Sequence, residues 1–311
     1  MQKIFGPVPS RRLGTSLGVD VIPYKTCTFD CVYCECGATT DKTVERRDFC
    51  PVREVVDELE ARLSAMRGKP DCITLSGSGE PTLYSRLGEL IDEAKRLTDL
   101  PVAVITNSSL LWMPDVRREL SRADVVLPSL DAATEDSFHR INRPHEFVSL
   151  PRIIDGLRTF LTEYRGAALL EILLIEGYNT DGRNLEALRS ILSGLRIDKV
   201  QLNTAVRPGS ERHIEPLDDA SMERIRAFFG PPCEVIASAR TTRMSHEESV
   251  LEDTIISLLE RRPCTIDDMS RSLGIAKPVV AKIVDSLAAA GAVTEQVHGR
   301  DIFFTAVRKN I

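Results

Sequence analysis

The most constraining feature of this 311-residue sequence is a closely spaced set of three cysteines, Cys27, Cys31 and Cys34. Their C-x3-C-x2-C spacing predicts a tight loop around a metal centre, directly after an apolar run at 16–22 that reads as a strand. Three thiolates leave one iron of a [4Fe–4S] cluster without a protein ligand, and that iron can bind a small molecule and pass it an electron. A site built only to carry electrons is expected to supply a fourth cysteine.

A zinc knuckle or a structural thiol cluster is the alternative, because Cys36 is close enough in sequence to be a fourth ligand. Zinc sites favour paired C-x2-C units, and this triplet is followed instead by a repeating pattern of strands and helices. The spacing therefore favours an iron–sulfur cluster.

Length and composition limit the class of protein that this sequence can encode. The chain exceeds the usual size of one core, which predicts one large and one small domain. No run approaches a membrane span, and the start of the chain has no apolar leader, so we expect a cytoplasmic protein without a membrane segment. Eight cysteines then argue for metal ligation and reduced thiols over disulfides. A net charge of −6 provides no overall basic surface for nucleic acid.

Apolar runs alternate with amphipathic segments through most of the chain. Each run carries its polar residues at its C-terminal end, the pattern of parallel strands with chemistry at the carboxyl rim of a barrel. The sequence therefore predicts an α/β fold, a partial (β/α)6 TIM-type barrel, whereas residues 5–14 read as an irregular, turn-rich lead-in. The expected strands are 16–22, 72–76, 102–107, 125–131, 168–175 and 199–203, with a short strand or edge at 233–237; the expected helices are 51–66, 84–96, 113–122, 148–164, 184–195 and 220–229.

The last part of the chain has a separate pattern. Helices expected at 251–259, 265–274 and 277–290 precede a two-stranded hairpin at 293–305, an order that resembles a winged-helix domain. Residues 249–311 contain as many basic as acidic side chains, so a basic stripe for nucleic acid is missing. Docking to a protein, a peptide or the catalytic domain is an equal alternative. We thus predict domains at 1–239 and 249–311, joined by a polar linker at 240–248.

Six residues that follow the expected strands are candidates for binding a cofactor. Glycines allow a backbone to turn sharply past a ligand, while polar side chains at strand ends either contact a ligand or serve as caps and turns. The six are Gly77, Gly79 and Glu80 after the second strand, and Asn107, Ser129 and Asp131 after the third and fourth.

Further polar residues have two interpretations each. Arg143 and His145 are suited to meet an anionic substrate or the cofactor carboxylate, or they lie in a solvated loop. Glu171, in the middle of a strand, needs a partner and is either a contact to cofactor or substrate or a paired structural acid. Arg207 is a reasonable contact for a phosphate or carboxylate near the barrel mouth.

The remaining cysteines and one lysine receive structural interpretations. Cys72 and Cys264 lie in apolar settings and are expected in the core. Cys36 is a spare thiol beside the cluster, a substrate-linking residue or a buried structural residue, and the structural role is favoured. Cys50 and Cys233 stay unassigned. Lys25, next to the cysteine loop, either meets the substrate or is a surface charge, and the surface charge is the expected role.

The cysteine spacing and its Tyr33–Cys34 ending resemble the radical S-adenosylmethionine (SAM) superfamily. The resemblance implies that the open iron chelates the methionine moiety of SAM, and that one electron splits the sulfonium to give a 5′-deoxyadenosyl radical that abstracts hydrogen from substrate. It implies a [4Fe–4S] cluster, SAM and a low-potential electron donor such as flavodoxin or ferredoxin. Gly77, Gly79 and Glu80 resemble the Gly-Gly-Glu element that binds the methionine amino group, with Ser78 interrupting the glycine pair. Residues at the positions of Ser129 and Asp131 commonly reach the ribose or carboxylate of SAM.

A more specific resemblance joins the runs 5–20 and 25–36 with 128–131, 141–145 and 201–203. Together they resemble the radical enzymes grouped with the wyosine tRNA synthases, over roughly residues 5–210. Those synthases use a second cluster held by upstream cysteines, and no cysteine precedes Cys27. The substrate therefore stays open between tRNA, a peptide and a small molecule. A non-enzymatic alternative is an iron–sulfur redox sensor whose winged helix binds DNA.

Overall fold

A curved, mostly parallel sheet forms the centre of the molecule. The computed structural model describes residues 3–10, 12–66, 68–211, 213–236 and 248–307. The sheet order is β1-β2-β5-β6-β7-β8-β9-β10; the neighbours from β2 to β10 run parallel, and β1 is antiparallel to β2. The expected α/β class and parallel strand pattern are confirmed. The strands are β1 (Ile4–Ser10), β2 (Gly14–Val19), β5 (Cys72–Leu75), β6 (Val102–Thr106), β7 (Val125–Pro128), β8 (Ala167–Leu174), β9 (Lys199–Thr204) and β10 (Cys233–Val235).

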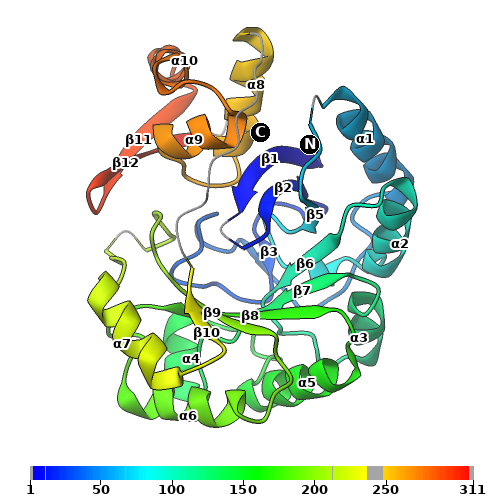
Figure 1. The fold of residues 1–311 in the computed structure, drawn as a ribbon, viewed down its shortest axis with the longest axis vertical. Helices are drawn as coiled ribbons and strands as arrows, with labels where there is room; N and C mark the ends of the chain where they lie inside the picture. The colour runs from blue at the N-terminus through cyan, green and yellow to red at the C-terminus, as the bar shows by residue number, and fades with distance from the viewer. Residues whose placement is uncertain (1–2, 11, 67, 212, 237–247, 308–311) are drawn as a thin grey trace.

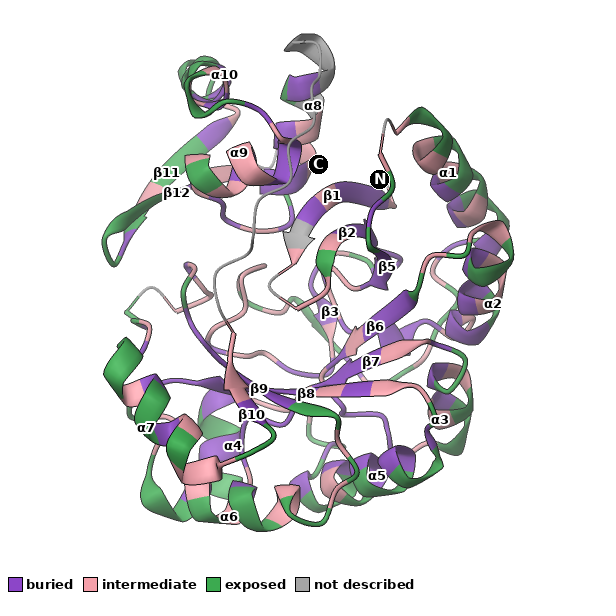
Figure 2. Cartoon of the chain, viewed as in Figure 1, coloured by how far each residue is buried: buried purple, intermediate pink, exposed green. Residues whose placement is uncertain are grey.

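Helices cover the outer face of the sheet and turn their apolar sides towards it (Figures 1 and 2). In the first of them Val52, Val55 and Leu59 recur at helical spacing and are buried. Each such aliphatic side chain contributes about 1.5–3 kcal/mol when it leaves water. The elements are α1 (Val52–Ala65), the 3-10 helix η1 (Pro81–Leu83), α2 (Leu87–Leu97), α3 (Pro114–Leu120), α4 (Glu135–Ile141), α5 (Leu150–Glu163), α6 (Gly182–Leu192) and α7 (Asp219–Phe229).

The prediction of an irregular segment at 5–14 is wrong, because its first half forms the edge strand β1. The strand contains Gly6 and Pro7, which argue against a regular strand in sequence alone. The register with β2 shifts between Phe5 and Val8, so the irregularity is accommodated inside the pairing. Prolines are tolerated at sheet edges, where a missing N–H breaks no ladder bond.

The C-terminal part contains the expected three helices and hairpin in the expected order. Thr265 and Asp268 form a reciprocal capping box at the start of the second helix, which Gly274 ends with a φ of 65°. The winged-helix interpretation stays a prediction, and the predicted linker lies outside the described residues apart from residue 248. No helix in the described part of the chain is long and apolar enough to cross a membrane. The elements are α8 (Glu248–Leu259), α9 (Ile266–Leu273), α10 (Lys277–Ala289), β11 (Val293–His298) and β12 (Asp301–Ala306).

This C-terminal unit, residues 248–307, packs on the barrel at its open side. Helices α8 and α9 contact β1, where Phe5 and Val8 share an apolar core with residues such as Leu251 and Leu258. At the far end of the unit, His298 Nε2 is 3.1 Å from the carbonyl oxygen of Ala205, in the loop after β9. Strands β1 and β10 are the two edges of the curved sheet. The unit therefore reaches from one edge towards the other (Figure 1).

Candidate active site

The cysteine triplet lies at the carboxyl rim, in the segment that follows β2. Cys27 ends the short strand β3 (Thr26–Cys27), which pairs with β4 (Asp41–Lys42). Two turns then fold the chain: the backbone N–H of Cys34 donates to the carbonyl of Cys31 at 3.1 Å, and that of Gly37 donates to the carbonyl of Cys34 at 2.9 Å. All three cysteines are half-buried. The spacing thus yields the tight loop that the sequence predicts.

Segments far apart in the sequence hold this loop in place. The backbone N–H of Val32 donates to the carbonyl of Ile141 at 3.0 Å. Ser210 Oγ, from the loop after β9, donates to the carbonyl of Cys31 at 2.9 Å. The loop conformation is therefore fixed by the protein's own hydrogen bonds from at least two sides.

Each thiol of the triplet has a side-chain N–H donor beside it. Two donors are amides and one is an ammonium group, and all come from residues at the barrel rim. Hydrogen bonds of this kind favour the thiolate form, which is the form that binds iron. The pairs are Asn107 Nδ2 with Cys27 Sγ at 3.6 Å, Asn142 Nδ2 with Cys31 Sγ at 3.4 Å, and Lys25 Nζ with Cys34 Sγ at 3.3 Å.

The donor set fits a [4Fe–4S] cluster. Burial raises the pKa of Cys27 to about 12 and holds the pKa of Cys31 well above its usual range, whereas the hydrogen bond from the Cys36 thiol, together with Lys25, holds the pKa of Cys34 below its usual range. In the described part of the chain, no three His, Cys, Asp or Glu side chains are arranged to hold a single metal ion. A cluster that takes one thiolate on each of three irons does not require such an arrangement.

The two glycines after β5 are required by close packing, of Gly79 against backbone and of Gly77 against a side chain. A Cβ on Gly79 would lie 2.0 Å from the carbonyl oxygen of Thr26, directly before Cys27. A Cβ on Gly77, whose φ is +151°, would lie 2.3 Å from Cγ of Asp20. Glycine at both positions lets this turn press against the base of the cysteine loop.

Glu80 anchors the end of β6. It is 2% exposed, and its Oε2 accepts from the backbone N–H of Asn107 at 2.8 Å. Its Oε1 accepts from Oγ1 of Thr82 and Oγ1 of Thr106, both at 2.6 Å. Burial raises its pKa. Both carboxylate oxygens therefore already have donors from the protein, and the expected contact between Glu80 and a methionine amino group stays a prediction.

Asp131 connects three elements around the cysteine loop. Its Oδ2 accepts from the hydroxyl of Tyr33 at 2.5 Å and from Nδ2 of Asn142 at 2.8 Å, and its Oδ1 accepts from the backbone N–H of Leu173 at 2.9 Å. Burial raises the pKa of Asp131 to about 6. Asn142 also donates to the thiol of Cys31. By accepting from the same amide, Asp131 fixes the orientation of the group that contacts this thiol.

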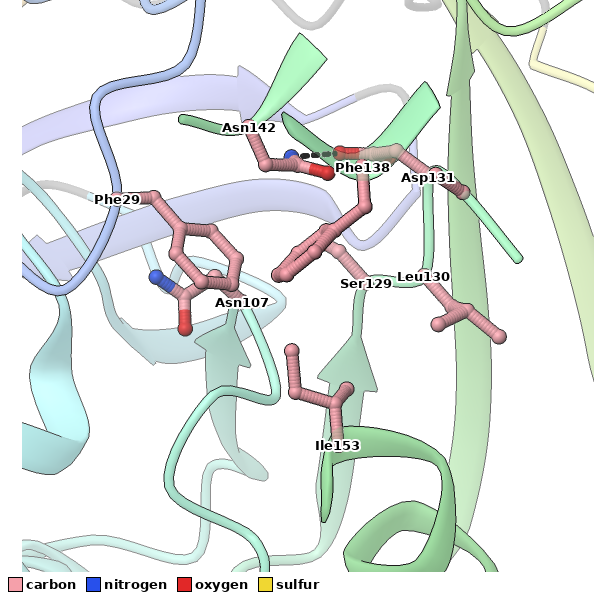
Figure 3. A pocket seen from close by; sticks show the side chains of 9 residues that line it. Phe29, Asn107, Ser129, Leu130, Asp131, Phe138, Asn142 and Ile153 are labelled. Atoms are coloured by element: carbon pink, nitrogen blue, oxygen red, sulfur yellow. Dashed lines mark hydrogen bonds between the residues drawn. The ribbon is translucent and has the colours of Figure 1, made fainter. Parts of the chain in front are cut away.

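Three of the predicted residues meet in one pocket beside the loop. Asn107, Ser129 and Asp131 line it, and Figure 3 shows the Asn142–Asp131 hydrogen bond at its edge. Side chains including Phe29 form its apolar part. The described lining does not include Gly77, Gly79 or Glu80, which lie instead against the base of the loop.

Two residues at the site were missed by sequence reasoning. Lys25 is 3% exposed, so the expectation of a surface charge is wrong. Asn142 lies in the run 141–145, in which the sequence indicates the charged residues Arg143 and His145 as candidates. In the structure Arg143 pairs with Glu211 at 2.8 Å, and the neutral amide faces the thiol.

The other candidate side chains are engaged within the protein. His145 stacks on Phe147, with ring centroids 5.5 Å apart. Glu171 pairs with Arg12 and also accepts from Asn203 at 2.8 Å, which favours the paired structural acid.

Arg207 and Cys36 both lie where the C-terminal unit meets the cysteine loop. Arg207 lies 3.2 Å from Glu35 and 4.0 Å from Asp268 of α9. Cys36 Sγ lies 3.1 Å from the carbonyl oxygen of Arg261. Cys72 and Cys264 are buried as predicted, and so are Cys50 and Cys233.

Comparisons with known proteins agree with this geometry. A family model described as the Radical SAM superfamily matches residues 21–183. A protein named GTPase Obg from Brachyspira hyodysenteriae is 35% identical over 299 residues, which are 95% of this chain but only 44% of that protein. A UPF0026 protein from Methanocaldococcus jannaschii is 34% identical over 289 residues and 90% of each chain.

Two weaker similarities bear on the fold and on the resemblance found in the sequence. The S-adenosyl-L-methionine-dependent tRNA 4-demethylwyosine synthase of Oryza sativa is 24% identical over 212 residues, 62% of this chain and 31% of that protein. The crystal structure of a radical SAM methyltransferase from Sphaerobacter thermophilus shares the fold, with a TM-score of 0.54 at 20% identity over 71% of this chain and 65% of that chain. The match to the family model covers more than half of the sequence and includes the cysteine triplet. The chain belongs to the radical SAM superfamily and is an iron–sulfur enzyme that uses a [4Fe–4S] cluster and SAM.

Proposed function

We propose that Cys27, Cys31 and Cys34 hold the cluster and that the enzyme abstracts hydrogen from a substrate bound at the carboxyl rim. The main support is the tight loop that carries them, in which each of the three thiols has its own N–H donor. When bound, the cluster supplies one electron to SAM, whose cleavage gives the 5′-deoxyadenosyl radical that takes the hydrogen atom.

The pocket residues position SAM in this proposal. Asn107, Ser129 and Asp131 contact it, because they lie together at the carboxyl rim next to the loop; the cavity between them, about 10 Å³, is the size of one water molecule, so SAM binds along this rim and not inside the cavity. The turn that carries Gly77 and Gly79 presents backbone groups to the methionine amino group. Glu80 supports that turn through its hydrogen bond to Asn107, while apolar side chains of the pocket exclude water.

Replacement of the cysteines tests the assignment. Anaerobically reconstituted Cys27→Ser, Cys31→Ser and Cys34→Ser variants, reduced with dithionite in the presence of SAM, should form no 5′-deoxyadenosine above the blank on chromatography. Cys233→Ala is the matched control, since Cys233 is buried in β10, and it should form product like the unaltered protein. Product formation by any one of the three serine variants would remove that cysteine from the ligand set.

A tRNA substrate has one supporting and one opposing observation. The similarity to tRNA 4-demethylwyosine synthase supports it. Against it, residues 249–311 have balanced charge, and Lys277 of α10 is already paired with Asp267 at 2.7 Å. Binding of total tRNA to the full chain, weakening steeply as salt rises, would support tRNA. Absence of binding would favour a peptide or small molecule, and cluster-dependent binding of duplex DNA would favour the redox sensor.

The electron donor is proposed to be a flavodoxin or ferredoxin, because the superfamily needs a reductant of low potential. Replacing dithionite with a reduced flavodoxin or ferredoxin should sustain formation of 5′-deoxyadenosine. If neither protein sustains it while dithionite does, the donor belongs to another class.

A further inference from the structure

Lys25 is a buried cation near the proposed cluster with no carboxylate beside it. Lysine is almost never fully buried unless it is paired, yet Lys25 is only 3% exposed. Its backbone has a φ of 63°, and its N–H donates to the carbonyl of Ser78 at 2.9 Å. The ammonium group contacts Cys34 Sγ at 3.3 Å and donates to the carbonyl of Gly37. None of the ion pairs among the described residues joins Lys25 to an acid.

We propose that Lys25 is the counter-charge of the cluster and raises its reduction potential. The inference rests on the proposed function, since it takes Cys27, Cys31 and Cys34 as the ligands. A cation taken out of water requires a compensating negative charge, and the Cys34 sulfur is the nearest candidate. A positive charge close to a cluster stabilises the reduced form, which carries one more electron, relative to the oxidised form.

The two amide donors have a different part in this arrangement. Asn107 and Asn142 present neutral dipoles to the other two thiols, at 3.6 Å and 3.4 Å. The attraction of a full charge falls off more slowly with distance than that of a dipole, so Lys25 acts on the whole cluster and not only on one sulfur. Its burial keeps solvent and salt from screening the interaction. Lys25 therefore acts through the cluster: its charge sets how readily the cluster accepts an electron.

A redox titration of the cluster followed by electron paramagnetic resonance, without SAM, tests the proposal. Lys25→Gln keeps an N–H donor and removes the charge, whereas Lys25→Arg keeps the charge. At a given applied potential, Lys25→Gln should show a ratio of reduced to oxidised cluster at least tenfold lower, which is a shift of about 59 mV for a one-electron couple. Lys25→Arg should stay near the unaltered protein, as should Lys42→Gln, which alters an exposed lysine on β4.

The iron and sulfide content of each variant separates the outcomes. If the unaltered protein holds no [4Fe–4S] cluster, the proposed function itself fails. If Lys25→Gln holds a cluster with an unchanged potential, only the inference about Lys25 is overturned. Loss of the cluster from Lys25→Gln but not from Lys25→Arg supports a required charge, whereas loss from both assigns Lys25 a structural role and overturns the inference.

Discussion

At the scale of single residues, the site depends on how closely two backbone segments approach. Gly79 meets the carbonyl of Thr26 so tightly that a methyl group has no space, and a carbonyl of the backbone cannot move aside as a flexible side chain does. Thr26 directly precedes the first cysteine of the triplet. A substitution at Gly79 would therefore displace the loop that carries the three cysteines.

Gly79→Ala should lower the free energy of unfolding of the metal-free protein by about 1–3 kcal/mol, in the range of other overpacked sites. Gly182→Ala is the matched control, because a Cβ there meets no atom within 4 Å at the start of α6. It should be neutral or stabilise the protein by up to about 1 kcal/mol. Urea denaturation followed by circular dichroism measures both, and equal stability of the two variants would contradict the prediction.

At the scale of elements, most strands and helices of the barrel were predictable from sequence because their buried faces repeat, but the short helix α4 was not among those expected. The edge strand β1 was not, since Gly6 and Pro7 hide the pattern and pairing with β2 overrides local preference. The tight loop that carries Cys27, Cys31 and Cys34 was predictable from their spacing; their role as ligands stays a prediction. Lys25 and Asn142 were not predictable, because their roles depend on contacts with a thiol that only the folded chain brings close.

The turn between α8 and α9 makes a buried charge contact with the barrel. Arg261 Nε lies 3.8 Å from Oδ2 of Asp20, and the two side chains are 4% and 2% exposed. The guanidinium also stacks over the ring of Phe5 at 4.5 Å. Burial raises the pKa of Asp20 above its usual value, and Arg261 partly offsets that rise.

Arg261→Met should cost about 3–5 kcal/mol of stability near neutral pH, because it leaves the Asp20 carboxylate buried without its cation. The folded state binds the Asp20 proton more tightly than the unfolded state, so stability falls as pH rises from the unfolded pKa of Asp20 towards its folded pKa. The variant raises the folded pKa further, and its deficit should therefore grow as pH rises. Urea denaturation at pH values of about 5 and 8 measures the deficit.

The double variant Asp20→Asn/Arg261→Met is the control for this charge contact. It should recover part of the lost stability, since it removes both charges, and its deficit should depend less on pH. A deficit of Arg261→Met that shrinks as pH rises would contradict the role given to Asp20.

At the scale of the whole molecule, the C-terminal unit and the barrel share one interface. Phe5 and Val8 of β1 are buried in the core of residues 248–307, and Arg207 reaches Asp268 across the same boundary. An edge strand with apolar side chains invites pairing with other chains when its cover is removed.

A chain that ends at residue 236 should therefore self-associate and unfold at a lower urea concentration than the full chain. The shortened chain that also carries Phe5→Ser and Val8→Ser should be monomeric. In the full chain the same two substitutions should lower the free energy of unfolding by about 1.5–3 kcal/mol for each buried apolar side chain that is lost. Size-exclusion chromatography with light scattering measures the association state. A shortened chain that stays monomeric and as stable as the full one would contradict the shared interface.

The hydrogen bonds that shape the cysteine loop also bear on how the enzyme is matured in a cell. Contacts such as Ser210 to Cys31 and Val32 to Ile141 join the loop to the loop after β9 and to the end of α4, and they involve only protein atoms. Because these contacts order the loop as part of the fold, the proposed cluster would bind a loop whose ordering entropy is lost during folding. We therefore expect the proposed cluster to be inserted late, after the barrel has folded.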